Sequence, residues 1–524
     1  MATPVANGTS ATGRRVRSQE QGFSVMRPRE WGLLVLAAAL ATIPVWVASF
    51  PPMTDLPQHA ATVSLLSNLH NPDFRFADLF WVNWFTPYLF SDVLCFGLTP
   101  LLGIVATCKF LTSVALMAVP LCTALLMQES GSDPFWAVLT IAALYGFTYS
   151  WGLLNYLVAT PIGLLFLVFA MRHGKKPTPG SSIVLAVFAV FLFFCHALIC
   201  ALFLAVAGFY TLAQAGNLRQ AIARISPMLA AIPIMLAWYL RASKELASQQ
   251  ATTWDLGWFT SVYPEYFGGR VSGFPARLLG LHLPSPVCIL IVISLFSIPL
   301  LAGERPCKRL TAWIPLALCV GILLFAPSSM LWVWAISHRF TIFALPFFLM
   351  ALRPAEVKRP AWRIAAVLLV AGWVAVITVQ TVRFDAEASG FKQVLAKMEP
   401  NERALSLIFT PWTGGFISPV FLHFPAWYSA SKMGVVDVNF TLWPTELVRY
   451  QPAAAPPVRL GWEWYPDKFN WRRWGGSAYR YFVVRAPTDE GYQLFRGVPC
   501  SISLEAHAGD WWLYESYCFS RSQP

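Results

Sequence analysis

The chain has 524 residues, of which 56% are hydrophobic and only 12% are charged, and its mean hydropathy is +0.55. A water-soluble enzyme of this length needs far more charged surface, so the composition excludes that class and indicates a polytopic membrane protein. The net charge of +12 comes largely from basic clusters between apolar runs. It therefore reports membrane topology and gives no reason to expect nucleic-acid binding.

The first 30 residues are polar and contain five arginines. The first apolar run, Trp31 to Ala48, follows them and has no small-residue cleavage site after it. We expect residues 1–30 to be a disordered cytoplasmic tail before an uncleaved signal anchor. Because positive flanks stay in the cytoplasm, this first span runs from inside to outside.

Further apolar runs, near the ~20 residues needed to cross a bilayer, fill much of the chain as far as Gln380. After residue 181 the expected spans are about 182–196, 197–214, 225–240, 285–302, 311–327, 338–352 and 361–381. This alternation places the basic clusters that begin at Arg172, Arg219, Arg305 and Arg353 in the cytoplasm. Upstream candidates are 87–104, 107–127, 134–150 and 153–171, and an odd number of them must cross. Segment 87–104, which contains Pro87, Asp92, Gly97 and Pro100, is expected to lie along the interface, which leaves about 11 transmembrane helices.

Residues 382–524 differ in character from the preceding chain, because they carry nine of the 23 tryptophans and no spanning run. We expect a small α/β domain outside the membrane, with Tyr479–Arg485 as a strand. Two roles are open for four of its tryptophans, Trp462, Trp464, Trp471 and Trp474. They either form the core and the membrane-facing side of the domain or bind glycan by stacking. Cys500 and Cys518 are the two cysteines of this domain, and an oxidising exterior leaves a disulfide and two free thiols as alternatives.

Chemistry is expected on the outer side, because the cytoplasmic loops are short and the chain has no Walker, dinucleotide or Gly-x-Ser-x-Gly motif. The larger outer segments are the loops 50–86 and 241–284 and the C-terminal domain. In the first loop, Asp55 precedes a helical stretch, and His59 lies four residues on, on the same face. Asp55 is either a helix cap or a carboxylate general base.

Three polar residues lie at the outer ends of expected spans. His196 interrupts an apolar run between two spans and is either a satisfied structural histidine or a functional one. His338 and Arg339 begin a later span on the outer side, where the positive-inside bias does not explain an arginine. Arg339 either binds a phosphate through its guanidinium fork or extends to lipid head groups.

Five further residues are candidates for lining a substrate cavity. Trp81 and Trp84 lie in the first outer loop, where an aromatic belt is the alternative. Glu265, Tyr266 and Arg270 belong to a polar and aromatic part of the second outer loop, where a structural role for each residue is the alternative.

Several motifs together resemble the GT-C superfamily of integral-membrane glycosyltransferases, and in detail an uncharacterised bacterial group placed near it. They are Thr54-Asp55-Leu56-Pro57-Gln58-His59, the Asn155-Tyr156 turn, His196-Ala197, His338-Arg339-Phe340 and the tail motifs Trp471-Arg-Arg-Trp, Tyr479-Arg-Tyr-Phe-Val-Val-Arg485 and Trp511-Trp-Leu-Tyr514. This chain departs from the better-known pattern, because no second acid is adjacent to Asp55 and the first loop is compact.

The resemblance implies a GT-C-like transmembrane domain at 31–381 and a periplasmic soluble domain at 382–524 of a bacterial inner-membrane protein. It implies inverting transfer of a sugar from a polyprenyl-phosphate donor to a glycan, lipid or protein acceptor. Asp55, assisted by His59, is then the general base, and Arg339, with His196 and His338, binds the donor phosphate. No metal or other cofactor is predicted, although some members of the superfamily use a divalent ion. The alternatives are a transporter and a non-catalytic scaffold for envelope assembly.

Overall fold

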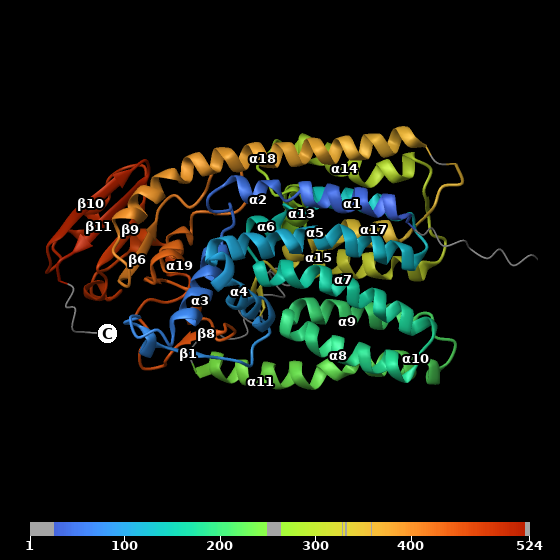
Figure 1. Cartoon of the computed structure of the whole chain (residues 1–524), viewed down its shortest axis with the longest axis horizontal. Coiled ribbons are helices and arrows are strands. Elements are labelled where there is room, and N and C mark those ends of the chain that lie inside the picture. The colour runs from blue at the N-terminus through green and yellow to red at the C-terminus, as the bar shows by residue number, and fades with distance from the viewer. Residues whose placement is uncertain (1–25, 249–263, 327–328, 331–332, 358, 519–524) are drawn as a thin grey trace, which may run out of the picture.

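The structure is a computed structural model that describes residues 26–248, 264–326, 329–330, 333–357 and 359–518. Most of the described chain is helical, and the long helices run along the long axis of the molecule (Figure 1). The main helices are α1 (Pro28–Leu40), α2 (Ile43–Val47), α3 (Leu56–Asn68), α4 (Leu89–Leu102), α5 (Ile104–Ser130), α7 (Leu154–Lys175), α8 (Pro179–Cys195), α9 (Ala197–Leu212), α10 (Leu218–Ile225), α11 (Ile232–Ser248), α13 (Pro264–Leu279), α14 (Ser285–Leu301), α15 (Ile314–Phe325), α17 (Ala344–Met350) and α18 (Pro360–Lys397). Helices α1, α8 and α18 begin with proline, whose fixed φ suits the first helical position.

Several of the helices have the length and composition of membrane-spanning helices. Among the described residues, five helical segments are long and apolar enough to cross a membrane: Pro28–Val47, Ile104–Ser130, Leu154–Lys175, Leu218–Lys244 and Pro360–Lys397. Shorter apolar helices accompany them, and aliphatic side chains such as Leu36 and Leu368 are exposed on the outside of the bundle, as contact with lipid requires. Helix α4, the segment expected along the interface, packs against α3, α5 and α7. The count of about 11 crossings stays a prediction.

Segment 134–150, expected as one of the apolar spans, is not a continuous α-helix. It consists of the 3-10 helix η2 (Pro134–Ala143) and the short helix α6 (Phe147–Ser150). Gly146 separates them, and a Cβ there would lie 2.6 Å from the backbone oxygen of Leu278 at the end of α13. The backbone of α13 therefore packs directly against the turn between η2 and α6, and every residue from 136 to 150 is buried.

The basic clusters gather at one end of the bundle. Arg172 and Lys175 at the end of α7 bind Glu129 at the end of α5, at 2.8 and 2.5 Å. In the turn after α5, the hydroxyl of Ser132 donates a hydrogen bond to the backbone oxygen of Leu352 in strand β5 (Leu352–Arg353). Strand β5 pairs with β2 (Arg305–Pro306). Helix α10 lies at this same end, opposite to the C-terminal sheet (Figure 1). This grouping agrees with the positive-inside arrangement, whereas the orientation in a membrane stays a prediction.

The C-terminal region contains a five-stranded sheet at the other end of the bundle. Its strands are β6 (Arg403–Ile408), β7 (Val435–Asp437), β9 (Tyr481–Arg485), β10 (Ile502–Ala508) and β11 (Trp511–Ser516), in the order β10-β11-β9-β6-β7. Strand β6 is parallel to β7 and β9, and the other pairs are antiparallel. The predicted strand at 479–485 is confirmed as β9. Trp471 and Trp474 are buried in the core of this region, which is the structural one of the two roles considered for them.

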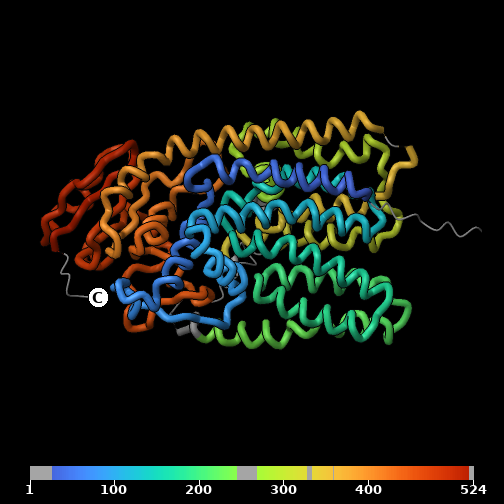
Figure 2. The backbone as a smooth tube through the Cα atoms, in the orientation of Figure 1, coloured from blue at the N-terminus to red at the C-terminus, as the bar shows by residue number. Residues whose placement is uncertain are grey.

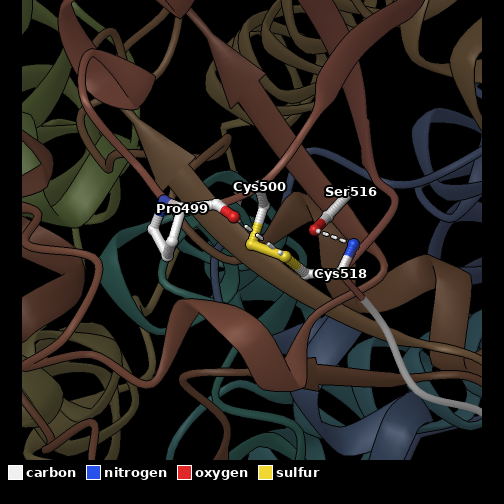
Figure 3. The surroundings of a disulfide bond; sticks show 4 residues. All are labelled: Pro499, Cys500, Ser516 and Cys518. Atoms are coloured by element: carbon white, nitrogen blue, oxygen red, sulfur yellow. Dashed lines mark hydrogen bonds between the residues drawn. A yellow bond between two sulfur atoms is a disulfide. The ribbon is translucent and has the colours of Figure 1, made fainter.

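A disulfide bond joins Cys500 to Cys518 beside β10 and β11 (Figure 3). It connects the segment that enters β10 with the one that leaves β11, 18 residues later. Of the two alternatives for these cysteines, the structure contains the bonded one.

The sheet region and the first loop of the chain are built together. Helix α18 continues without a break from the bundle to the sheet, through the expected domain boundary at residue 381. Strand β1 (Phe80–Val82) of the first loop pairs with β8 (Val448–Tyr450) of the C-terminal region. Figure 2 shows these early and late segments side by side at the sheet end. Residues separated by more than 350 positions therefore meet at this end of the molecule.

Candidate active site

Asp55 stands at the N-terminus of α3, where Pro57 occupies the first turn. Its side chain makes no capping hydrogen bond to the helix. Instead, the Nδ1 atom of His423 lies 2.9 Å from Oδ1 of Asp55, so an imidazole from the C-terminal region holds the carboxylate. The interpretation of Asp55 as a simple cap is therefore wrong, and Oδ2 makes no hydrogen bond within the described part of the chain.

The backbone around Asp55 is fixed by the turn that precedes α7. The amide of Asp55 donates to the backbone oxygen of Trp151 at 2.9 Å. Gly152 follows with a φ of +81°, which L side chains rarely adopt, and a Cβ there would lie 2.5 Å from the Asp55 nitrogen. The close packing of these two turns sets the position of the carboxylate.

A Gly152→Ala substitution should therefore displace Asp55. We expect the catalytic rate to fall by about tenfold or more, because a shift of roughly 1 Å in a reacting group can cost about a hundredfold. Turnover is measured beside the thermal unfolding of the purified protein in detergent. The matched control is Gly208→Ala on α9, where a Cβ meets no atom within 4 Å. Equal activity of the two variants would contradict this role of Gly152.

His59 lies one helical turn after Asp55 and is buried. Burial lowers the pKa of its imidazole to about 4, a nearby His423 adds to the decrease, and the Asp55 carboxylate opposes it. The ring is therefore neutral at pH 7. It packs edge-on against Phe440, and its Nδ1 has no hydrogen-bond partner among the described residues. His59 thus contributes an uncharged polar group that remains available to a ligand.

Asp55 and His59 line a cavity of about 420 Å³. The same cavity is lined by His196, from the junction of α8 and α9, and by Arg339, from the helical turn α16 (Ile336–Arg339). The structure thus places four of the predicted site residues around one space. Their chemical roles remain predictions.

Arg339 is positioned by its own turn. The guanidinium donates through Nε and Nη2 to the backbone oxygen of Trp334, at 3.2 and 3.0 Å. Ala335 between them has a φ of +54°, an uncommon conformation for a residue with a side chain, and it folds the chain so that this carbonyl faces the guanidinium. Within the described chain, no carboxylate forms an ion pair with Arg339, so its charge is available to an anion in the cavity.

His196 serves partly as a structural residue. Its Nδ1 accepts a hydrogen bond from the amide of Leu198 at 3.2 Å and so caps α9. The ring packs against those of Tyr88 and Tyr156, with centroids 5.2 and 5.1 Å away. Because Nδ1 is the acceptor, Nε2 carries the proton of the neutral ring and can donate a hydrogen bond.

Three ionisable residues of the C-terminal region also line the cavity, and sequence reasoning missed all three. They are His423, Glu446 and Glu463. Burial raises the pKa of Glu446, with further contributions from the negative charges of Asp92 and Asp55. Burial also raises the pKa of Glu463, and the nearby His423 opposes it. One oxygen of each glutamate has no hydrogen-bond partner in the described chain, as expected of groups that face a polar ligand.

The raised pKa values keep these glutamates protonated to a higher pH than an exposed glutamate, and a protonated carboxyl donates a hydrogen bond as well as accepting one. The only available signal was their setting, Thr445-Glu446 and Trp462-Glu463-Trp464, because acids are rare in such aromatic surroundings. Trp464 also lines the cavity, so it departs from its buried neighbours Trp471 and Trp474.

The remaining predicted residues lie elsewhere. His338 and Arg270 line a second, separate cavity, because consecutive residues of the α16 turn face different directions. Trp81 lies in β1, where its indole donates to the backbone oxygen of Tyr450 and Arg449 lies over its ring. Trp84 is 61% exposed and lines neither cavity.

Glu265 and Tyr266 fall in α13, and their side chains lie outside the described part of the structure. No group of three or more His, Cys, Asp or Glu residues suited to a metal ion occurs among the described residues. Metal independence stays a prediction.

A comparison with known protein families finds no match for this chain, and a comparison with curated proteins finds none either. Among solved structures, the chain is similar to the oligosaccharyltransferase of Archaeoglobus fulgidus. The apo form has a TM-score of 0.42 and 9% sequence identity, covering 87% of this chain and 69% of that one. The form with zinc and sulfate has a TM-score of 0.37 and 11% identity, covering 88% and 69%. At these scores the similarity alone defines neither the fold nor the activity, so the following proposals rest on the cavity itself.

Proposed function

We propose that the protein is a membrane glycosyltransferase that moves a sugar from a polyprenyl-phosphate donor to an acceptor hydroxyl or amide at the sheet end of the bundle, in the periplasm of a bacterial cell. The observation that carries this proposal is that Asp55 and Arg339 line the same cavity. A base and an anion-binding group around one space are the two elements that such a transfer needs.

Proton removal is assigned to Asp55. Its Oδ2 takes the proton from the acceptor while the acceptor atom forms a bond to the anomeric carbon. His423 holds Oδ1 at 2.9 Å and so orients the carboxylate, which makes it a positioning residue. The neutral His59 is one turn away and accepts or donates a hydrogen bond to the acceptor or the sugar.

Departure of the lipid phosphate is assigned to Arg339. As the bond from the anomeric carbon to the phosphate oxygen breaks, its electron pair stays on the phosphate, and the fixed guanidinium stabilises the growing negative charge. Attack and departure on opposite faces invert the anomeric configuration. Glu446 and Glu463 supply hydrogen bonds for sugar hydroxyls on the wall formed by the C-terminal region.

The proposal is tested with purified protein and synthetic polyprenyl-phosphate-linked hexoses and pentoses, each offered with extracts of cell-envelope acceptors. We expect release of polyprenyl phosphate together with a product of inverted configuration. Movement of the intact donor across a vesicle membrane without cleavage would instead indicate a transporter. Binding of envelope components without turnover would indicate a scaffold.

The Asp55–His423 pair predicts a pH dependence of stability. Burial lowers the pKa of His423, but the hydrogen bond and charge of Asp55, aided by Glu463, more than offset it, so the pKa lies above its ordinary value. The pair therefore stabilises the folded state fully below about pH 6.5, and this contribution is lost as the pH rises through the folded-state pKa. We expect the difference in Tm between wild type and His423→Gln to be largest in acid and to shrink at alkaline pH. A difference that grows with pH would contradict a charged His423.

A further inference from the structure

A second cavity, of about 320 Å³, lies between α13, α14, α15 and α17. It shares no lining residue with the first cavity. Its wall is mostly aliphatic and aromatic, with Phe274, Phe296 and Phe348 among its residues. A space with such walls inside a membrane bundle suits hydrocarbon and offers few partners for the hydroxyl groups of a sugar.

The described residues that line this cavity extend along the helices. On the path from α16 to α17 it is lined by His338, Thr341, Ala344 and Phe348, which are separated by three, three and four residues and so share one helical face. Ten residues of helix correspond to about 15 Å of length. A trough of this length, only 320 Å³ in volume, fits one hydrocarbon chain rather than two lying side by side.

One end of the trough is positively charged. Arg270 and Arg277 are seven residues apart on α13, which places both on the face that lines the cavity, and His338 lies at the same end. Among the described residues that line this cavity, none is acidic. Within the described residues no carboxylate pairs with Arg277, whose Nη1 and Nη2 donate to backbone oxygens of Arg270 and Gly269, both at 3.2 Å.

The chain also provides room for this guanidinium. A Cβ at Gly273 would lie 2.8 Å from Cζ and Nη2 of Arg277. Two of the five guanidinium N–H groups are occupied by the backbone oxygens, so others are free for an anion. Because a charge inside a membrane bundle is costly without a counter-charge, an anion beside the Arg277 guanidinium would stabilise that side chain.

We propose that the second cavity binds a single-chain lipid phosphate, with its hydrocarbon tail in the trough and its phosphate at Arg270 and Arg277. The consecutive residues His338 and Arg339 face the second and the first cavity respectively, so the phosphate end of this lipid adjoins the site of transfer. This inference rests on the proposed function, which makes a lipid phosphate the leaving group. The cavity then retains the sugar-free polyprenyl phosphate that transfer releases.

Binding is measured by native mass spectrometry of the full-length protein in detergent, without any sugar donor. The probes are polyprenyl phosphate, the two-chain phosphomonoester phosphatidic acid, and inorganic phosphate. We expect polyprenyl phosphate to bind, and Arg277→Gln to weaken it by about tenfold or more, as the loss of a charge-assisted hydrogen bond predicts. Phosphatidic acid and inorganic phosphate should bind much more weakly.

Two further variants test the site without removing a charge. Gly273→Ala should displace the Arg277 guanidinium and weaken binding, and Ala344→Phe should fill the trough and exclude the tail. The matched control is Arg383→Gln, which removes an exposed arginine of α18 and should leave binding unchanged. Thermal unfolding of each variant establishes that the fold is retained.

Equal binding of phosphatidic acid, or polyprenyl phosphate binding that is unaffected by Arg277→Gln and Gly273→Ala in folded proteins, would overturn the inference. These results are separate from those on the proposed function, because they need no turnover. Transfer that depends on Asp55 with no lipid effect of Arg277 would leave the function standing and overturn the second site. If lipid phosphate binding depends on Arg277 but the protein has no transferase activity, the second site stands and the proposed function is overturned.

Discussion

Replacement of Asp55 by Asn should lower the rate of sugar transfer by about 10²–10⁴-fold, the usual contribution of a positioned general base. The amide retains the size of the carboxylate and can still accept a hydrogen bond from His423 through its oxygen, so the fold and the binding of the lipid donor should persist. The measurement is turnover under saturating donor, with donor binding determined separately on the same preparation.

Asp78→Asn is the matched control for this experiment. Asp78 belongs to the same loop as Asp55, but it is exposed and lines neither cavity. The control should have wild-type activity. An Asp55→Asn protein with unchanged turnover would remove the base from the proposed mechanism, and loss of both turnover and folding would show that the pair with His423 is structural.

Replacement of Arg339 by Gln is the second large effect expected. Loss of a fixed cation at the departing phosphate should lower the catalytic rate by about 10²–10³-fold, as for other preorganised groups that stabilise developing charge. Because the charge on the phosphate grows as the bond breaks, the effect should fall more on kcat than on KM. Steady-state kinetics over a range of donor concentrations separates the two constants.

Arg339→Lys is the informative companion. It keeps the charge, but it loses the planar fork that is anchored to the Trp334 carbonyl, so it should recover only part of the activity. Full recovery would mean that charge alone suffices at this position. Unchanged kcat in Arg339→Gln would exclude Arg339 from the leaving-group side of the cavity.

The membrane character of the protein and the positions of its helices could be read from the sequence. Apolar runs define helices because hydrocarbon leaves backbone polar groups no partner outside the helix. At 134–150 the structure divides the apolar run into η2 and α6, with Gly146 against the backbone of α13 between them, and whether this segment crosses a membrane stays a prediction. A contact between segments more than 100 residues apart leaves no mark in local hydropathy.

The sequence was sufficient to select four candidate residues, Asp55, His59, His196 and Arg339. Polar side chains at the ends of apolar runs are costly to place near a membrane, so their presence points to function. Their common cavity could not be deduced, since no periodicity relates α3, the junction of α8 and α9, and α16. His338 illustrates the limit. It is adjacent to Arg339 in sequence, yet the turn of α16 directs the two side chains to different cavities.

The sequence alone determined that the chain crosses a membrane, which residues are apolar enough to do so, and that its basic clusters alternate with them. These properties follow from the transfer of side chains between water and lipid, which depends on composition over short stretches. Only the tertiary structure decided that His423, Glu446 and Glu463 join Asp55 at one cavity. That arrangement depends on the pairing of β1 with β8 and on the contact of α3 with the C-terminal region, and such long-range packing is specified by the whole chain rather than by any one segment.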